Sequence, residues 1–162
     1  MSRYAKIIKN DVVDGEGICV SFWIQGCPFH CHNCHNPQTW DFDGGYEIPL
    51  DIRGQLIKDI AENGIVRNFS VLGGEPLCPE NITIIDEIIT GVRMAYPSIK
   101  IFLWTGYEFE DLKKRDNDAH IKNIFNNIDV LIDGPYLDSE RDITLSLRGS
   151  KNQRVLYKGI NF

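Results

Sequence analysis

The chain has 162 residues, which suits one compact domain over residues 1–162 with its own hydrophobic core. Its 23 acidic and 17 basic residues give a formal net charge of −6, which argues against a broad nucleic-acid surface of clustered Lys and Arg. No apolar run is long enough to cross a membrane, and the first residues lack the apolar stretch of a secretory signal, so we expect a cytoplasmic protein.

Strand-like and helical segments alternate along the first part of the chain. Residues 19–25 are β-branched and aromatic, which predicts a buried strand, and residues 51–62 place apolar side chains at helical spacing. Residues 69–72 form a short apolar run that ends at two glycines, which again indicates a strand. A stripe of isoleucine and valine residues then predicts a helix over residues 79–96.

The same alternation continues toward the C-terminus. Residues 100–104 predict a third strand, and residues 109–114 and 119–126 are weaker helical stretches. Residues 130–132 predict a fourth strand, and residues 154–157 are long enough for a short terminal strand.

Strands that alternate with helices imply crossover connections and a mostly parallel sheet. Four or five such units are too few to close an eight-stranded barrel. The fold class that we predict is α/β, an open partial (β/α) barrel with a mostly parallel curved sheet in a single domain. In such folds, chemistry takes place at the C-terminal ends of the strands.

Three of the five cysteines lie within eight residues of one another, with the spacing C-x3-C-x2-C, and they are Cys27, Cys31 and Cys34. Three thiolates on a short loop can hold three irons of a 4Fe–4S cluster, which leaves the fourth iron open to a substrate. Cys19 and Cys78 lack this spacing, so we expect Cys19 to be a small buried strand residue and Cys78 a helix-start residue, and neither to be a cluster ligand. An odd cysteine count without a secretory signal argues against a disulfide framework.

Structural zinc is the alternative for this loop, because three histidines lie in or beside it, namely His30, His32 and His35. Zinc modules usually draw two ligand pairs from separated segments, whereas these cysteines share one loop. The spacing therefore favours an iron–sulfur cluster, and we interpret the three histidines as loop residues. His120 has no such neighbours in the sequence and is predicted to lie at the surface.

A second motif, Gly73-Gly74-Glu75-Pro76, follows the second predicted strand. Two glycines alone predict only a tight turn before a helix. Glu75 adds a carboxylate and backbone acceptors at the C-terminal end of a strand, which suits an ammonium group. Together with the cysteine loop, the motif indicates a cofactor site.

The two motifs together resemble the radical S-adenosylmethionine superfamily. The resemblance implies that the amino and carboxylate groups of S-adenosylmethionine chelate the fourth iron, and that Gly73, Gly74 and Glu75 help hold the amino group. It further implies that one electron from the cluster splits the sulfonium into methionine and a 5′-deoxyadenosyl radical. A low-potential cluster in direct contact with its substrate suits this reaction, because a sulfonium is hard to reduce.

Further segments resemble the activating proteins of anaerobic (class III) ribonucleotide reductases over nearly the whole chain. These segments are Asp14-Gly15-Glu16-Gly17, Gly26-Cys27, Cys34-His35-Asn36-Pro37 with Thr39-Trp40, Thr105-Gly106-Tyr107, Ile132-Asp133-Gly134-Pro135 and the stretch from Arg148 to Arg154. The last stretch is the most specific to that family. One departure is Ile18-Cys19, which stands where relatives often have an arginine.

This second resemblance implies an activase whose protein partner is the anaerobic ribonucleotide reductase, on which it generates a glycyl radical. An electron donor such as flavodoxin or ferredoxin is also implied. Further candidates for contacts to the cofactor or the partner are Asn33, Thr105, Asp133 and the loop from Ser150 to Gln153. Trp40 and Trp104 are candidates to line the site, but they are expected mainly in the core. A radical enzyme with a small-molecule substrate and a non-enzymatic zinc module are the two alternatives.

Overall fold

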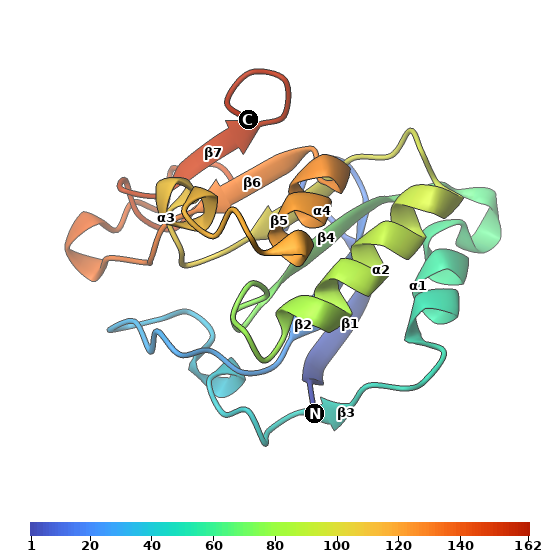
Figure 1. The fold of residues 1–162 in the computed structure, drawn as a ribbon, viewed down its shortest axis with the longest axis horizontal. Helices are drawn as coiled ribbons and strands as arrows, with labels where there is room; N and C mark the ends of the chain where they lie inside the picture. Colours follow the sequence, from blue (N-terminus) through green and yellow to red (C-terminus); the bar gives the residue numbers. More distant parts are fainter.

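The computed structural model describes all 162 residues, and its centre is one open seven-stranded sheet of order β3-β1-β2-β4-β5-β6-β7 (Figure 1). The strands are β1 (Arg3–Asp11), β2 (Cys19–Ile24), β3 (Tyr46–Glu47), β4 (Asn68–Gly73), β5 (Ile101–Trp104), β6 (Val130–Asp133) and β7 (Arg154–Tyr157). Strands β2, β4, β5 and β6 run parallel in the middle of the sheet. Antiparallel strands border them, with β1 and β3 on one side and β7 on the other.

Four α-helices connect or flank these strands, and they are α1 (Ile52–Ile60), α2 (Ile82–Ala95), α3 (Phe109–Lys113) and α4 (Ala119–Asn127). Short 3-10 turns are η1 (Pro37–Thr39), η2 (Glu62–Gly64) and η3 (Asp138–Glu140). Every predicted helix is present. Helix α2 starts three residues later than predicted, because the Cys78 carbonyl accepts from the amides of Asn81 and Ile82 in a preceding turn. No helix combines the length and the apolar character needed to cross a membrane.

The α/β class and the parallel centre of the sheet are confirmed, but the sheet is mixed. The analysis of the sequence did not predict β1 or the two-residue β3. Strand β1 pairs antiparallel with β2, with Tyr4 opposite Ile24 and Ile7 opposite Phe22. Its sequence, RYAKIIKND, mixes charged and apolar residues, because many of its side chains are only half buried. The partial barrel stays a prediction.

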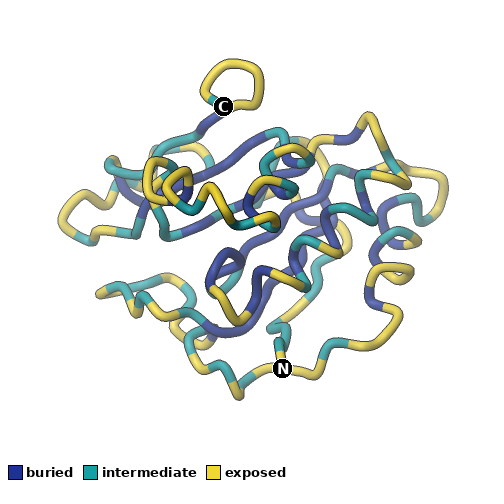
Figure 2. Tube along the Cα trace, in the orientation of Figure 1, coloured by how far each residue is buried: buried dark blue, intermediate teal, exposed yellow.

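Alternating side chains give the sheet two different faces. Val20, Phe22 and Ile24 of β2 point toward α1, α2 and α4 and join a core of 23 buried apolar residues. The opposite face carries a smaller apolar cluster around Phe102 and polar side chains such as Ser21, and it is covered only by loops. Figure 2 shows the central strands buried and the connecting loops largely exposed. We call these the helix face and the loop face.

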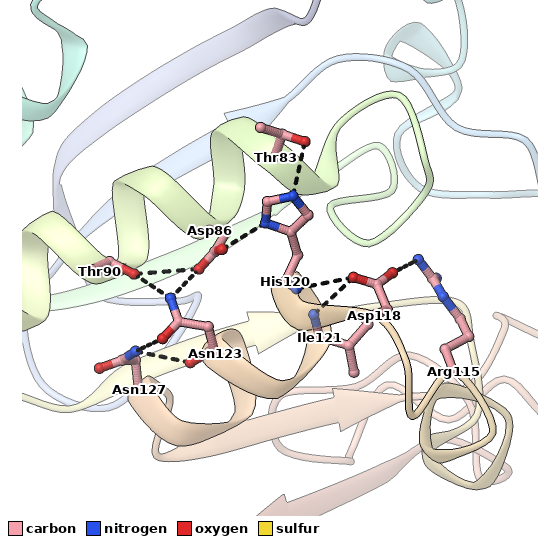
Figure 3. Close-up of polar contacts among 9 residues, drawn as sticks. All are labelled: Thr83, Asp86, Thr90, Arg115, Asp118, His120, Ile121, Asn123 and Asn127. Carbon is pink, nitrogen blue, oxygen red and sulfur yellow. Dashed lines mark hydrogen bonds and ion pairs between the residues drawn. The ribbon is translucent and has the colours of Figure 1, made fainter.

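A polar seam joins α2 to α4 on the helix face (Figure 3). His120 Nδ1 lies 2.7 Å from Asp86 Oδ2, and the Asn123 amide donates to Asp86 Oδ1 at 2.5 Å and to Thr90 Oγ1 at 2.7 Å. His120 Nε2 lies 3.4 Å from Thr83 Oγ1. The prediction that His120 is a plain surface residue is therefore only half right: its side chain is 42% exposed, but it links two helices.

Candidate metal and cofactor site

A cavity of about 150 Å³ opens where β2, β4 and β5 end. We call it the cluster cavity. It is lined by the three clustered cysteines of the loop after β2, by the glycine turn after β4 and by Thr105 and Gly106 after β5. The parallel topology thus brings together motifs that lie far apart in the sequence, as predicted for the C-terminal ends of the strands.

The cysteine loop is tightly coiled and leaves many of its backbone groups free. His30 and Asn33 have positive φ values of 47° and 55°, which a short loop needs in order to reverse direction twice. None of the amides from Phe29 to Asn33 donates a hydrogen bond to a backbone carbonyl. Amides without carbonyl partners are available to sulfur acceptors instead.

The thiols in this loop are free and half buried. Burial raises the pKa of the Cys27 thiol to about 11, although hydrogen bonds from the amides of Phe29 and His30 oppose this shift. Burial also raises the pKa of Cys31. A bound metal must therefore displace thiol protons, as metal binding by cysteine generally does.

These residues fit a 4Fe–4S cluster in the chemistry of their donors: three thiols share one cavity, in a loop whose amides from Phe29 to Asn33 do not donate to backbone carbonyls. No three Cys, His, Asp or Glu side chains are arranged to hold a single metal ion. The loop histidines have other contacts. His30 stacks on Trp40 at 4.7 Å between ring centres, and His35 packs against Tyr136 at 4.9 Å.

Glu75 is buried, with 1% of its surface exposed, and its carboxylate is fully bonded within the protein. Oε1 accepts from Leu77 N at 2.9 Å and from Thr105 Oγ1 at 2.7 Å, while Oε2 accepts from Gly106 N at 2.7 Å. Burial raises the pKa of Glu75 to about 7, and these hydrogen bonds oppose the shift. The carboxylate therefore ties the turn after β4 to the turn after β5.

The two glycines before Glu75 are required by close contacts. Gly73 has a φ of +113°, and a Cβ on Gly74 would overlap the carbonyl oxygen of Gly26. The Gly74 carbonyl accepts no hydrogen bond within the protein, although Gly74 lines the cavity. The Glu75 carboxylate is thus used up within the protein, whereas this backbone oxygen is not.

The other predicted site residues are placed differently. Thr105 lines the cluster cavity. Asn33 is exposed and donates to Asp138 Oδ2 at 3.0 Å, outside the cavity lining. Asp133 is 1% exposed and accepts from Phe109 N at 2.8 Å and from Arg154 Nε at 3.0 Å, so its carboxylate links β6 to α3 and β7.

The stretch from Arg148 to Arg154 braces the segment that follows β6. Gln153 Oε1 accepts from Gly149 N at 2.9 Å and from Ser150 N at 3.1 Å, and its amide donates to Gly134 O at 3.0 Å. Asn152 donates to Pro135 O at 2.7 Å. The two family-specific segments thus form one unit, which places Tyr136 in the wall of the cluster cavity.

The analysis of the sequence missed one residue that holds the site together. Asn81 is fully buried and donates to Gln25 O at 3.0 Å and to Glu75 O at 3.1 Å, which holds the cysteine and glycine loops together. The sequence prediction placed Asn81 inside the helix over residues 79–96, whereas it is the residue before the observed α2. Trp40 and Trp104, expected mainly in the core, are half buried and line the cavity.

Comparison with known proteins gives consistent results. Residues 13–156 match the model of the 4Fe-4S single cluster domain. The anaerobic ribonucleoside-triphosphate reductase-activating protein of Pasteurella multocida is 31% identical over 157 residues, which cover 96% of this chain and 97% of the relative. Proteins of the same name from Escherichia coli and Enterobacteria phage T4 are 33% and 32% identical, over 94% of this chain and 97% and 92% of theirs. The chain therefore belongs to the family of anaerobic ribonucleoside-triphosphate reductase-activating proteins, with a 4Fe–4S single cluster domain.

Proposed function

We propose that this protein is a radical S-adenosylmethionine enzyme that generates a glycyl radical on an anaerobic ribonucleotide reductase. The observation that carries the proposal is a single cavity that unites three cysteine thiols with the unbonded carbonyl of Gly74. Relatives named for activation of that reductase, aligned over nearly the whole chain, support the same partner.

Cys27, Cys31 and Cys34 would hold the cluster, in a loop whose amides have no carbonyl partners from Phe29 to Asn33 and could donate to sulfur. When bound, the cluster supplies a low-potential electron and an open iron to S-adenosylmethionine, whose cleavage yields methionine and the 5′-deoxyadenosyl radical. The cysteine loop is also the exposed rim of the cavity. An electron donor such as flavodoxin or ferredoxin would approach the cluster from that side.

The turn after β4 would hold the amino group of S-adenosylmethionine through the Gly74 carbonyl. Glu75 would act as a positioning residue, because its bonds to Thr105 and Gly106 fix the turn in which that carbonyl lies. Phe29 and Trp40 add aromatic walls that exclude water from the same space.

The radical would then take a hydrogen atom from the Cα of a glycine in the reductase, which gives 5′-deoxyadenosine and a glycyl radical. A primary carbon radical must be kept away from water and stray hydrogen donors. The partner's glycine segment would complete the enclosure. Glycine suits this role because it has no side chain and lets the backbone approach closely.

The test is electron paramagnetic resonance on the reduced, anaerobic protein mixed with reductase that contains α-deuterated glycine. We expect a persistent radical whose doublet splitting collapses upon deuteration, and deuterium in 5′-deoxyadenosine. If a small metabolite supplies the hydrogen and the reductase never does, the enzyme acts on small molecules and the proposal is wrong.

A further inference from the structure

A second cavity, of about 360 Å³, lies on the loop face of the sheet. Trp23, Leu72 and Trp104 form its floor, from three neighbouring parallel strands. One wall is the loop between β1 and β2, with Val13 and Asp14, and the opposite wall is the loop before β7. Its lining also includes Cys34 and part of the stretch from Arg148 to Arg154.

The second cavity is continuous with the cluster cavity. The two share Cys34, Leu72, Trp104 and Tyr136 among their lining residues. An occupant of the second cavity would therefore reach the place where the cluster and S-adenosylmethionine are proposed to lie, without crossing the core of the protein.

Two charged side chains in the walls of the second cavity lack charged partners. None of the ion pairs in the protein includes Asp14 or Arg148. The Arg148 guanidinium donates only from Nη1, to Gln153 O at 2.6 Å, and its buried Nε has no partner at all. Buried polar groups without partners are costly, so they are rare outside places where a ligand completes them.

Asp14 is half buried in the opposite wall. Burial and the neighbouring Asp11 raise the pKa of its carboxyl group to about 6. One wall thus offers a hydrogen-bond acceptor and the other a donor, across a floor that is mainly apolar. A polypeptide backbone, which carries a donor and an acceptor in each residue, matches this arrangement.

The two loops that form the walls of the second cavity also expose apolar side chains. Val12 and Val13 are 71% and 76% exposed in one loop, and Ile143 is 83% exposed in the other. Exposed apolar residues gathered beside a groove are typical of a surface that binds another protein.

We infer that the second cavity receives the glycine-bearing segment of the reductase as an extended polypeptide, with Asp14 accepting from and Arg148 donating to that segment. This inference rests on the proposed function, because it takes the reductase as the partner. It adds the route by which the partner's glycine reaches the cofactor and the two side chains that select it.

Two variants test the inference in the anaerobic protein with its cluster. Asp14→Asn and Arg148→Gln should each weaken binding of the reductase by about tenfold, which corresponds to about 1.4 kcal/mol for a lost hydrogen bond to a charged group. Asp14→Asn keeps the shape of the side chain, so it still tests the inference if Arg148→Gln misfolds. Asp116→Asn and Lys122→Gln are matched controls, because both residues are exposed and lie outside both cavities.

Affinity for S-adenosylmethionine, measured on the same variants, distinguishes the possible occupants. We expect it to stay at the wild-type value. If it falls as much as reductase binding, the second cavity belongs to the cofactor and the inference is wrong, while the proposed function stands. If both variants bind the reductase as the wild type does, the inference also fails.

A photo-cross-linking residue at Val13 gives an independent test. It should join the glycine-bearing segment of the reductase, whereas the same residue at the exposed Met94 of α2 should not. Equal cross-linking from both positions would overturn the inference. A wild-type protein that never forms a glycyl radical on the reductase would instead contradict the proposed function.

Discussion

The α2–α4 seam and the cluster cavity are both built from polar side chains, but they differ in how those groups are bonded. In the seam, Asp86, His120 and Asn123 bond one another across the helices. Around the cavities, donors and acceptors are left over. Of the five buried side-chain atoms without a partner, four belong to residues that line or brace the two cavities, namely Trp40, Asn81, Arg148 and Asn152.

The difference in bonding assigns the two regions different roles, stability to the seam and ligand binding to the cavities. A seam with its bonds complete contributes to folding and has little left to offer a ligand. A cavity with leftover donors and acceptors gains its partners only when a ligand arrives. Changes in the cavity should therefore impair ligand binding more than folding, and changes in the seam should do the reverse.

The largest expected effect comes from the cysteine loop. Replacement of Cys27, Cys31 or Cys34 by Ala should abolish stable cluster binding and all radical formation, because each thiol is one of only three ligands. Iron content and the spectrum of the reduced, anaerobic protein measure the loss. Cys19→Ala and Cys78→Ala are the controls, since both thiols are buried away from the loop, and they should keep near wild-type iron. Retention of the cluster by Cys31→Ala together with its loss from Cys19→Ala would refute the assignment.

Glu75 should show a mixed effect, because it lies in the cavity but is bonded like a residue of the seam. Glu75→Ala should keep iron, yet weaken S-adenosylmethionine binding by about 1–3 kcal/mol as the turn loses its bonded carboxylate. Calorimetry on the anaerobic, reduced protein measures this affinity. Glu75→Gln keeps the shape and should fall between Glu75→Ala and the wild type. An unchanged affinity in the alanine variant would remove Glu75 from the site.

Asp14 should lower the free energy of unfolding at neutral pH, because its carboxylate is half buried in the wall of the second cavity. Its folded-state pKa of about 6 is above the ordinary 3.8, so the folded protein binds this proton more tightly than the unfolded chain. The protonated Asp14 side chain therefore stabilises the folded protein fully below about pH 4. This contribution is lost as the pH rises to about 6, and it stays lost above that pH. Asp14→Asn should remove this dependence. Urea midpoints of variant and wild type across this range measure it, and parallel curves would contradict the shift.

Features set by neighbouring residues could be predicted from the sequence, whereas features set by contacts between residues far apart in the chain could not. The spacing of the cysteines, the glycine turn and the apolar stripe of α2 are local patterns, and each indicated its element. The partners of Glu75 are not local: Gly106 lies 31 residues away. Nor are those of Gln153, whose acceptor Gly134 lies 19 residues away. A carboxylate or amide that is consumed by such a contact looks the same in the sequence as one that is free for a ligand.

The same limit explains why strand β1 and the polar seam were not predicted. Strand β1 has no clean alternation, because its pairing with β2, and not its own pattern, determines which side chains are covered. His120 stands without any neighbouring motif, and only the packing of α4 on α2 brings it to Asp86. Tertiary contact created both features, so no local rule could predict them.

The smallest expected effect comes from breaking the seam itself. His120→Ala removes the contacts to Asp86 and Thr83 in a half-exposed position, so it should cost about 0.2–1 kcal/mol of unfolding free energy. Asn123→Ala should cost more, because this side chain makes two shorter bonds, at 2.5 and 2.7 Å, and is partly buried. Both variants should keep the cluster, the affinity for S-adenosylmethionine and the reductase binding of the wild type, since the seam lines neither cavity. Anaerobic urea unfolding measures the first effect, and iron content with binding measurements checks the second. Loss of ligand binding in His120→Ala at unchanged stability would mean that the seam serves the site, and the separation between the two regions would not hold.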